Sequence, residues 1–406
     1  MTTQGIKPWY KQSTLWPIPK NWEILEFWEF AEQWKNKYTP KEWENLRCIE
    51  LEHIEQWNWN IKWRINSSEQ KSVKNVFKKW EILYWKLRPY LRKYWLAQRD
   101  WVCSGEIWVL NSKNNLCCNE YLYRIIQSFQ FNQIANVSSW SKMPRADWDF
   151  VCNYPFPLPT ITEQKIIVNI LWITDNTITK IQNMIENLEL RNKWLIQQLV
   201  SWKLRLKWFS WSWKLMRFKD IFIPFKEKAW NNNYELLSVT KDGIYSQREY
   251  FNKEISSDDV SEYLVIKKWD FAMSGLNFRM WSAHMLYEYE AWIISPAYKT
   301  FHIKNENVYT DFMRFFIESS SMRRALVWSS VQWASIVRRN LDSEMLENRQ
   351  FSIPTLEEQK TIANVLNKAT KQLDLYKQKL EKLQELKKWL MQQLLTWKVR
   401  VKEFRN

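Results

Sequence analysis

The side chains best suited to chemistry in this sequence are arginines and lysines that lie beside aromatic residues near probable turns. Such cations pair with phosphate, and arginine can also fork onto the major-groove edge of guanine. They lie in LYWKLRPYLRKY and SKMPRADW in the first half of the chain, and in LNFRMWSAH and SIVRRNL in the second. The candidate DNA contacts are Lys86, Arg88, Arg92, Lys93, Lys142, Arg145, Arg279, His284, Arg338 and Arg339. For each residue alone, a solvated surface role is the alternative.

The sequence offers no catalytic set to accompany these cations. It lacks the Asn-Pro-Pro-aromatic or Asp-Pro-Pro-Tyr tetrapeptide of amino-methyltransferases, and CNYPFPL (Cys152–Leu158) is only the nearest segment. A phosphate loop would require glycines at Trp80 and Trp85, and Leu87 would then occupy the Ser/Thr position that holds magnesium. Three histidines and five cysteines without a C-x-x-C pair form no zinc pattern. We therefore expect a non-catalytic chain without metal or cofactor, with reduced cysteines.

The charge balance suits a polyanionic partner. The 406 residues include 60 Lys and Arg against 44 Asp and Glu, and the net charge of +16 is spread along the chain. DNA or RNA is the expected partner of such a surface, and a solvated basic surface without a partner is the alternative. No run approaches the roughly 18 apolar residues of a membrane span, and the start lacks a signal peptide's apolar stretch. We expect a cytoplasmic protein without membrane contact.

An internal repeat organises the chain. PTITEQKIIVNIL (Pro159–Leu171) returns as PTLEEQKTIANVL (Pro354–Leu366), and KWLIQQLVSWKLRLK (Lys193–Lys207) returns as KWLMQQLLTWKVRVK (Lys388–Lys402), both at an offset of 195 residues. Each copy opens with Pro-Thr and then Glu-Gln, a pattern that resembles a capping box. The repeat therefore predicts two long helices.

Within each copy of the repeat, apolar residues recur at alternating intervals of three and four residues, as in a coiled coil. The predicted seam consists of Leu171, Ile178, Ile185, Leu195 and Leu199 in the first copy, and Leu366, Leu373, Leu380, Leu390 and Leu394 in the second. Asn192 and Lys387 are polar at the same seam position, which fixes register at some cost in stability. Two matching seams favour pairing with each other, and the alternative is that each helix packs on its own domain. A helix of about 40 residues is roughly 60 Å long and could act as a ruler.

The regions between the helices are also weakly similar to each other. KKWEILYWKLR (Lys78–Arg88) parallels KKWDFAMSGLN (Lys267–Asn277), and WVCSGEIWVL (Trp101–Leu110) parallels WIISPAYKTF (Trp292–Phe301). Short apolar and aromatic runs broken by turns are typical of strands. We predict an α+β fold with a doubled plan, in which domains at 1–157 and 208–352 alternate with long helices at 158–207 and 353–406.

The sequence resembles the specificity subunit of type I restriction–modification enzymes over nearly its whole length. The resemblance rests on the two P-T-x-x-E-Q-K openings, the two Q-Q-L-[VL]-[ST]-W-K-[LV]-R ends, PIPKNWEILEF (Pro17–Phe27), ILYWKLRPYLRK and KMPRADW. It implies two mixed α/β target-recognition domains in a pseudo-two-fold repeat, each reading half of a split, asymmetric double-stranded DNA target. Two long antiparallel coiled-coil helices would join the domains and set the spacing.

The resemblance also implies partners. Two methyltransferase subunits with S-adenosylmethionine would dock on the helices and methylate adenine, and translocating restriction subunits would use ATP and Mg. Two other interpretations of the sequence remain. A coiled-coil scaffold or regulatory DNA-binding protein would use the same helices without base-specific readout, and a fused enzyme would carry its own nuclease or methyltransferase activity.

Thirty tryptophans against four glycines are a separate anomaly, since about 7% glycine is usual. Trp202 and Trp397 follow the long helices where a left-handed glycine cap is favoured, and Trp80 and Trp269 lie in Lys-Lys-Trp-acid turns. Trp85, Trp101, Trp140, Trp281, Trp292, Trp328 and Trp333 look similar, whereas Trp22 and Trp148 fit as tryptophan. We hypothesise that UGA codons read as glycine in the host were translated as tryptophan. A truly tryptophan-rich protein is the alternative.

Overall fold

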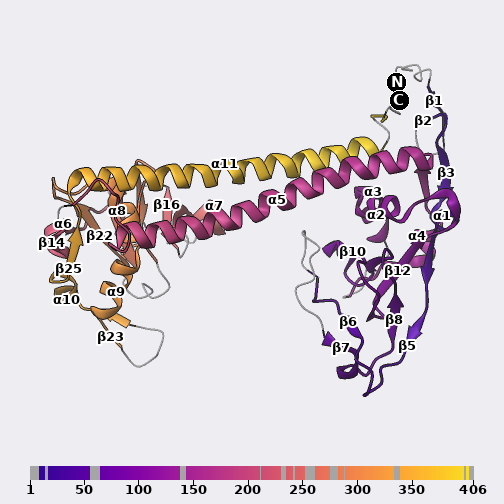
Figure 1. Cartoon of the computed structure of the whole chain (residues 1–406), viewed down its shortest axis with the longest axis horizontal. Helices are drawn as coiled ribbons and strands as arrows, with labels where there is room; N and C mark the ends of the chain where they lie inside the picture. Colours follow the sequence, from indigo (N-terminus) through magenta and orange to yellow (C-terminus); the bar gives the residue numbers. More distant parts are fainter. Residues whose placement is uncertain are drawn as a thin grey trace. The chain divides into compact units, whose positions relative to one another are not determined.

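The computed structural model describes residues 9–13, 17–54, 65–137, 143–210, 212–229, 235–240, 243–251, 261–274, 282–287, 289–332, 339–396 and 399–401. It divides into two compact units, Met1–Gln182 with Lys379–Asn406, and Asn183–Gln378. Each unit combines a globular region of strands and short helices with part of two 40-residue helices, α5 (Ile161–Val200) and α11 (Leu356–Leu395) (Figure 1). These units divide the chain differently from the predicted segments, because each includes parts of both long helices.

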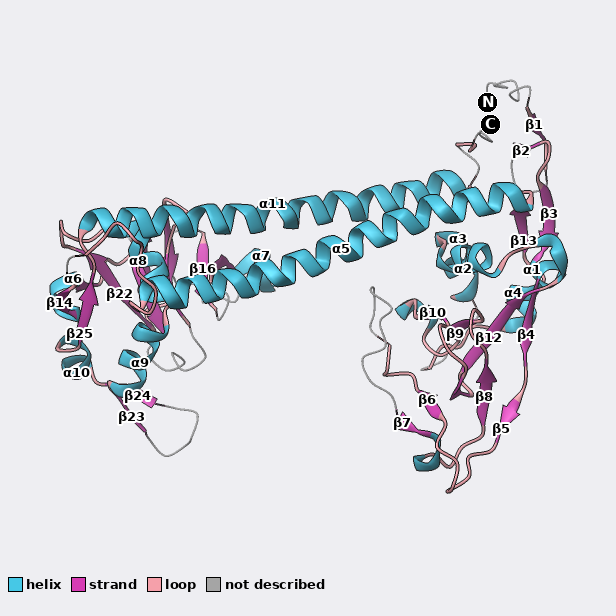
Figure 2. Ribbon diagram, in the orientation of Figure 1, coloured by secondary structure: helices cyan, strands magenta, loops and turns pink. Residues whose placement is uncertain are grey.

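The described part of the first unit contains two larger sheets and two strand pairs, β1 with β2 and β3 with β13 (Figure 2). Its strands are β1 (Tyr10–Lys11), β2 (Ile18–Pro19), β3 (Glu23–Glu26), β4 (Ala31–Trp34), β5 (Lys37–Tyr38), β6 (Arg47–Ile49), β7 (Ile65–Asn66), β8 (Lys74–Phe77), β9 (Ile82–Trp85), β10 (Tyr94–Leu96), β11 (Trp101–Ser104), β12 (Ile107–Ser112) and β13 (Pro155–Leu158). Its short helices are α1 (Phe27–Phe30), α2 (Asn119–Gln127), α3 (Phe129–Ala135) and α4 (Trp148–Cys152). One sheet has the order β10-β9-β12-β4, and the other has the order β5-β8-β11-β6-β7 with β11 and β6 parallel.

The second unit repeats this topology. Its strands are β14 (Lys214–Arg217), β15 (Phe222–Phe225), β16 (Leu236–Val239), β17 (Ile244–Ser246), β18 (Leu264–Lys267), β19 (Phe271–Ser274), β20 (Ala283–Met285), β21 (Ala291–Ile294), β22 (Tyr298–Ile303), β23 (Ser330–Gln332), β24 (Arg339–Leu341) and β25 (Gln350–Ile353). Its short helices are α6 (Phe218–Ile221), α7 (Gln247–Phe251), α8 (Thr310–Ile317), α9 (Ser320–Trp328) and α10 (Ser343–Glu347). The order β20-β19-β22-β15 matches β10-β9-β12-β4, and the order β18-β21-β16-β17 matches β8-β11-β6-β7, including one parallel pair, β16 with β21. Among the described residues of the second unit, β5 has no counterpart in this sheet. The predicted doubled α+β fold is confirmed.

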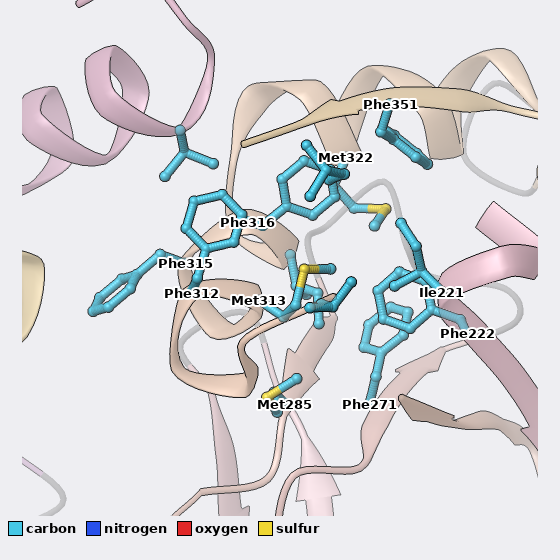
Figure 3. Packing of buried hydrophobic residues seen from close by; sticks show 14 of the residues in the cluster. Ile221, Phe222, Phe271, Met285, Phe312, Met313, Phe315, Phe316, Met322 and Phe351 are labelled. Atoms are coloured by element: carbon cyan, nitrogen blue, oxygen red, sulfur yellow. The ribbon is translucent and has the colours of Figure 1, made fainter. Parts of the chain in front are cut away.

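Aromatic rings pack against one another in the largest buried cluster of each unit. In the first, Phe27 lies 5.5 Å from Phe131 and 5.6 Å from Phe156 between ring centroids. In the second, Phe222 lies 5.4 Å from Phe271. Figure 3 shows side chains from β15, β19 and α8 converging on this second core. Both cores include residues of the long helices, so each helix is held by a globular region as well as by its partner helix.

The two long helices begin in the same way. Thr160 accepts a hydrogen bond from the Glu163 amide at 3.4 Å, which forms one half of the predicted capping box. The Glu163 carboxylate accepts instead from Trp22 Nε1 at 2.9 Å. At the start of α11 the Glu358 carboxylate accepts from Trp213 Nε1 at 3.2 Å. The repeated glutamate therefore ties each helix to its globular region rather than capping it.

Five residues other than glycine have φ in the left-handed region, among the described residues. Trp80, Trp202 and Trp269 have φ of 72°, 65° and 74°, and Arg88 and Arg92 have φ of 54° and 49°. Left-handed backbone is unusual for any side chain and uncommon for bulky ones. Among all the helices that the structure describes, none is long and apolar enough to span a membrane.

Candidate nucleic-acid interface

The basic segment after β9 forms a tight loop in the first unit. Pro89–Leu91 is a single 3₁₀ turn, and the arginine on each side of it, Arg88 and Arg92, has left-handed backbone. Both arginines and Tyr90 between them are exposed. Residues held in sparsely populated backbone conformations cluster at functional sites. The loop presents two cations and one aromatic ring to solvent, and its left-handed backbone marks it as a candidate functional site.

A second segment, about 55 residues further along, lies against this loop. The Ala146 amide donates to the Lys86 carbonyl at 2.8 Å, and the Arg88 amide donates to the Pro144 carbonyl at 2.7 Å. An antiparallel bridge joins Leu87 to Arg145. The structure thus brings Lys86, Arg88 and Arg145 together, although the sequence places them in separate motifs.

One carboxylate joins two of these cations. Glu106, in the turn between β11 and β12, accepts from Arg145 Nε at 3.0 Å, and the same oxygen lies 3.8 Å from Lys86 Nζ. The Lys86 amide also donates to the Glu106 carbonyl at 3.2 Å. The motif-based prediction missed Glu106, because only the fold brings it to the basic segments.

The remaining predicted DNA contacts differ from these residues in burial and in hydrogen-bond partners. Lys93 is half-buried and donates to the Leu51 carbonyl at 2.9 Å. His284 in β20 is 5% exposed and lies 3.5 Å from the Glu318 carboxylate. Little of the imidazole surface is therefore open to a partner, and the assignment of His284 as a DNA contact stays a prediction. Arg339 begins β24, with its backbone opposite Gln332. Lys142, Arg279 and Arg338 lie outside the described residues.

The predicted seam residues all lie on α5 and α11 and are all at least half-buried, whereas most residues between them are exposed. The buried ones are Leu171, Leu199, Leu366 and Leu394, and the half-buried ones are Ile178, Ile185, Leu195, Leu373, Leu380 and Leu390. Within the second unit, Asn192 donates to the Ala369 carbonyl at 3.0 Å and Lys377 pairs with Glu189 at 2.9 Å. Residue numbers rise on one helix as they fall on the other, so the helices run antiparallel.

The lysine at the polar seam position is paired within the first unit. Lys387 Nζ lies 2.6 Å from one oxygen of Asp175, and Arg124 from α2 lies 2.6 Å from the other. Burial lowers the pKa of Lys387, and the charge of Asp175 opposes this shift. The carboxylate thus pairs with two largely buried cations from two different helices.

The described residues hold no group of three or more His, Cys, Asp or Glu side chains suited to a metal ion. All five cysteines are unpaired thiols, and Cys48, Cys103 and Cys117 are buried. Burial raises the pKa of the Cys48 thiol to about 12, so this thiol is protonated at neutral pH.

Comparison with protein families shows that the model of the type I restriction modification DNA specificity domain matches this chain twice, over residues 19–190 and over residues 212–385. The two matches follow the doubled topology. Among curated proteins, the EcoDI specificity subunit of a type I restriction enzyme from Escherichia coli is 28% identical over 162 residues, which are 39% of this chain and 36% of that protein. The MjaVIII specificity subunit from Methanocaldococcus jannaschii is 24% identical over 74% of this chain and 75% of its own length.

Solved structures share the fold at low sequence identity. A chain from a study of complex assembly and conformational transition of the type I R-M system has a TM-score of 0.61 at 14% identity, covering 93% of this chain and 98% of that one. The HsdS subunit from Thermoanaerobacter tengcongensis has a TM-score of 0.53 at 14% identity, covering 96% and 100%. An S subunit from M. genitalium has a TM-score of 0.51 at 13% identity, covering 92% and 96%.

Proposed function

The chain belongs to the type I restriction–modification DNA specificity family, and from this premise we propose that it reads a split, asymmetric DNA target within a larger complex. Each globular region reads one half of the target. The observation that carries this proposal is the repetition of the same strand order in both globular regions, because two similar recognition modules suit a target in two parts. The cations gathered around Glu106 support a DNA-facing surface on the first module.

Joining two modules explains how such a protein gains specificity. One mismatched base pair typically costs ~1–3 kcal/mol, so a short half-site discriminates only moderately. Two linked modules add their discrimination, provided that the linker lets both engage at once. We propose that α5 and α11 provide this linkage and set the spacer between the half-sites.

The reaction itself belongs to partner subunits in this proposal. Two methyltransferase subunits with S-adenosylmethionine dock on the long helices, and restriction subunits use ATP and Mg, while this chain carries no cofactor and acts in the cytoplasm. The names of the relatives as specificity subunits support this division. The purified chain alone, given S-adenosylmethionine, ATP and Mg, should neither methylate nor cut DNA. Activity under these conditions would favour the fused-enzyme alternative.

Selection of DNA by the purified chain tests base-specific readout. Random duplexes are bound, recovered and sequenced over several rounds at moderate salt. We expect enrichment of two short motifs at a fixed separation. Strong binding without any enriched motif would favour the scaffold alternative, and one contiguous motif would contradict a split target.

A further inference from the structure

We propose that Glu106 is a positioning residue that orients Lys86 and Arg145 toward DNA. This inference rests on the proposed function. The two cations come from separate segments, yet both approach the same carboxylate oxygen, at 3.8 Å and 3.0 Å. Without a carboxylate between them, the two like charges would repel each other. With it, they face one site together and suit a phosphate or a guanine edge.

The backbone around Glu106 is already fixed by hydrogen bonds. Lys86 donates to the Glu106 carbonyl and accepts from the Ala146 amide, so all three segments are joined at the main chain. What Glu106 adds is side-chain orientation, because its bond to Arg145 Nε restricts the directions in which the guanidinium group can point. Ordering these side chains before DNA arrives lowers the entropy lost on binding.

The exposure of the cluster argues against a purely structural role. The side chains of Lys86, Glu106 and Arg145 are 26%, 33% and 49% exposed. Ion pairs this open to solvent add little to folding stability. Their value therefore lies in presenting cations at the surface, and a carboxylate beside a phosphate-binding site is tolerated because it sets geometry.

The test compares Glu106→Gln with Glu42→Gln in the full chain. Both variants remove one negative charge from the first globular region, and Glu42 is exposed. Affinity is measured for the selected target and for an unrelated duplex, and thermal melting checks folding. In Glu106→Gln we expect the ratio of specific to non-specific affinity to fall about tenfold, with non-specific affinity unchanged or raised. In Glu42→Gln the ratio should stay at the wild-type value.

A double-mutant cycle separates orientation from charge. If Glu106 acts through Arg145, Glu106→Gln should have little further effect on the ratio in an Arg145→Ala background. An unchanged ratio in Glu106→Gln, or equal effects in both backgrounds, would overturn the inference while leaving the proposed function intact. A wild-type chain with no sequence preference would overturn the proposed function itself.

A separate observation concerns the tryptophans. We infer that the natural chain carries glycine at Trp80, Trp202 and Trp269, because φ is left-handed at all three. Glycine adopts this backbone without the steric cost that a Cβ brings. Trp80 and Trp269 lie in equivalent turns, where their amides donate to Ala97 and Leu286 carbonyls at 2.7 and 2.6 Å. Trp202 follows the end of α5, the usual place of a glycine cap.

Other tryptophans fit their sites as tryptophan. Trp22 and Trp213 are 1% and 7% exposed, and their indole nitrogens donate to the glutamates that begin the two long helices. Trp80 and Trp202, by contrast, are 48% and 44% exposed. Trp269 is half-buried against the core of the second unit, so the left-handed backbone, and not exposure, is what these three tryptophans share. We expect this if UGA encodes glycine in the source and UGG encodes tryptophan.

The coding DNA and a stability series test this inference. We expect UGA at codons 80, 202 and 269, and UGG at codons 22 and 213. The combined variant Trp80→Gly, Trp202→Gly and Trp269→Gly should melt several degrees higher than the tryptophan form, whereas Trp22→Gly should melt lower. UGG at the three left-handed positions, or a lower melting temperature for the combined variant, would overturn the inference.

Discussion

Arg88 and Arg92 combine an exposed charge with unfavourable backbone. Their φ values of 54° and 49° place both in the left-handed region, which costs a residue with a Cβ roughly 1–2 kcal/mol. Glycine would adopt the same backbone more easily but would carry no charge. An arginine at each position places a positive charge on a strained, exposed loop, which suits a charge that binds a ligand.

Arg88→Gly should therefore separate stability from binding. We expect the free energy of unfolding to rise by about 1 kcal/mol while affinity for duplex falls and the slope of log affinity against log salt decreases by about one. Denaturant titration and binding at several salt concentrations measure both quantities. Lys41→Gly is the control, since Lys41 is exposed with ordinary φ. Unchanged affinity and salt slope in Arg88→Gly would contradict the DNA-contact assignment.

Motifs in the sequence predicted the basic segments but not their partners. Local patterns brought Lys86, Arg88 and Arg145 into the candidate set, whereas Glu106 lies 20 residues from Lys86 and joins it only through strand pairing. His284 was chosen for its basic neighbours, and the burial of β20 against Glu318 could not be seen locally. Side-chain environment depends on residues distant in sequence, so spacing alone does not give it.

A glutamine that recurs near the start of both long helices, Gln164 in α5 and Gln359 in α11, ties each helix to its globular region. Gln359 donates to the carbonyls of Pro354 and Asn307 at 2.8 Å each and accepts from the Tyr309 amide at 2.7 Å. Gln164 makes the same three bonds, with Pro159, Leu116 and Cys118, at 2.9, 2.7 and 3.1 Å. Both glutamines are fully buried. The Glu-Gln pair at each helix start thus serves tertiary attachment.

Replacing this glutamine should cost far more than replacing an exposed one. Gln359→Leu leaves buried backbone groups without partners, so we expect a loss of about 2–4 kcal/mol in unfolding free energy. Gln384→Leu, on the exposed side of α11, is the matched control and should change stability by under about 0.5 kcal/mol. Denaturant unfolding measures both. Equal small losses would show that the bonds of Gln359 contribute little.

The ion pair at the seam makes a second prediction for the helices. Asp175→Asn leaves Lys387 and Arg124 largely buried without their carboxylate, so we expect a loss of about 3 kcal/mol. The double variant Asp175→Asn with Lys387→Met should recover part of it. Because burial lowers the pKa of Lys387, the loss in Asp175→Asn should shrink as rising pH removes the lysine proton. A loss that does not change with pH would contradict this account.

The sequence predicted the long helices better than it predicted the order of the strands in the sheets. Alternation by three and four predicted both long helices, because each exposes one face to solvent along its length. The sequence did not reveal the strand order, since β9 pairs with β12 and β10 through the sheet rather than through any local signal. The Thr-x-x-Glu motif predicted the helix starts, but the glutamate bonds to Trp22 and Trp213 instead of capping.

The doubled plan of the chain predicts that the length of the two long helices sets the number of base pairs between the two half-sites. Deleting residues 181–187 together with 376–382 removes one heptad from each helix at equivalent repeat positions and keeps the seam in phase. Seven residues span about 10.5 Å of helix, so we expect the permitted spacer to shorten by up to about three base pairs. Site selection with the shortened chain measures the spacer. The same spacer as in the wild-type chain would exclude a ruler.

Mapping methylated adenines in DNA from cells that co-express this chain with its neighbouring methyltransferase gene tests the central claim most directly. The proposed function predicts methylation within one asymmetric motif, made of two short conserved parts separated by a fixed number of unspecified base pairs. Both parts should be required. Methylation of a single contiguous motif, or of adenines in no common sequence, would contradict a subunit that reads its target in two halves.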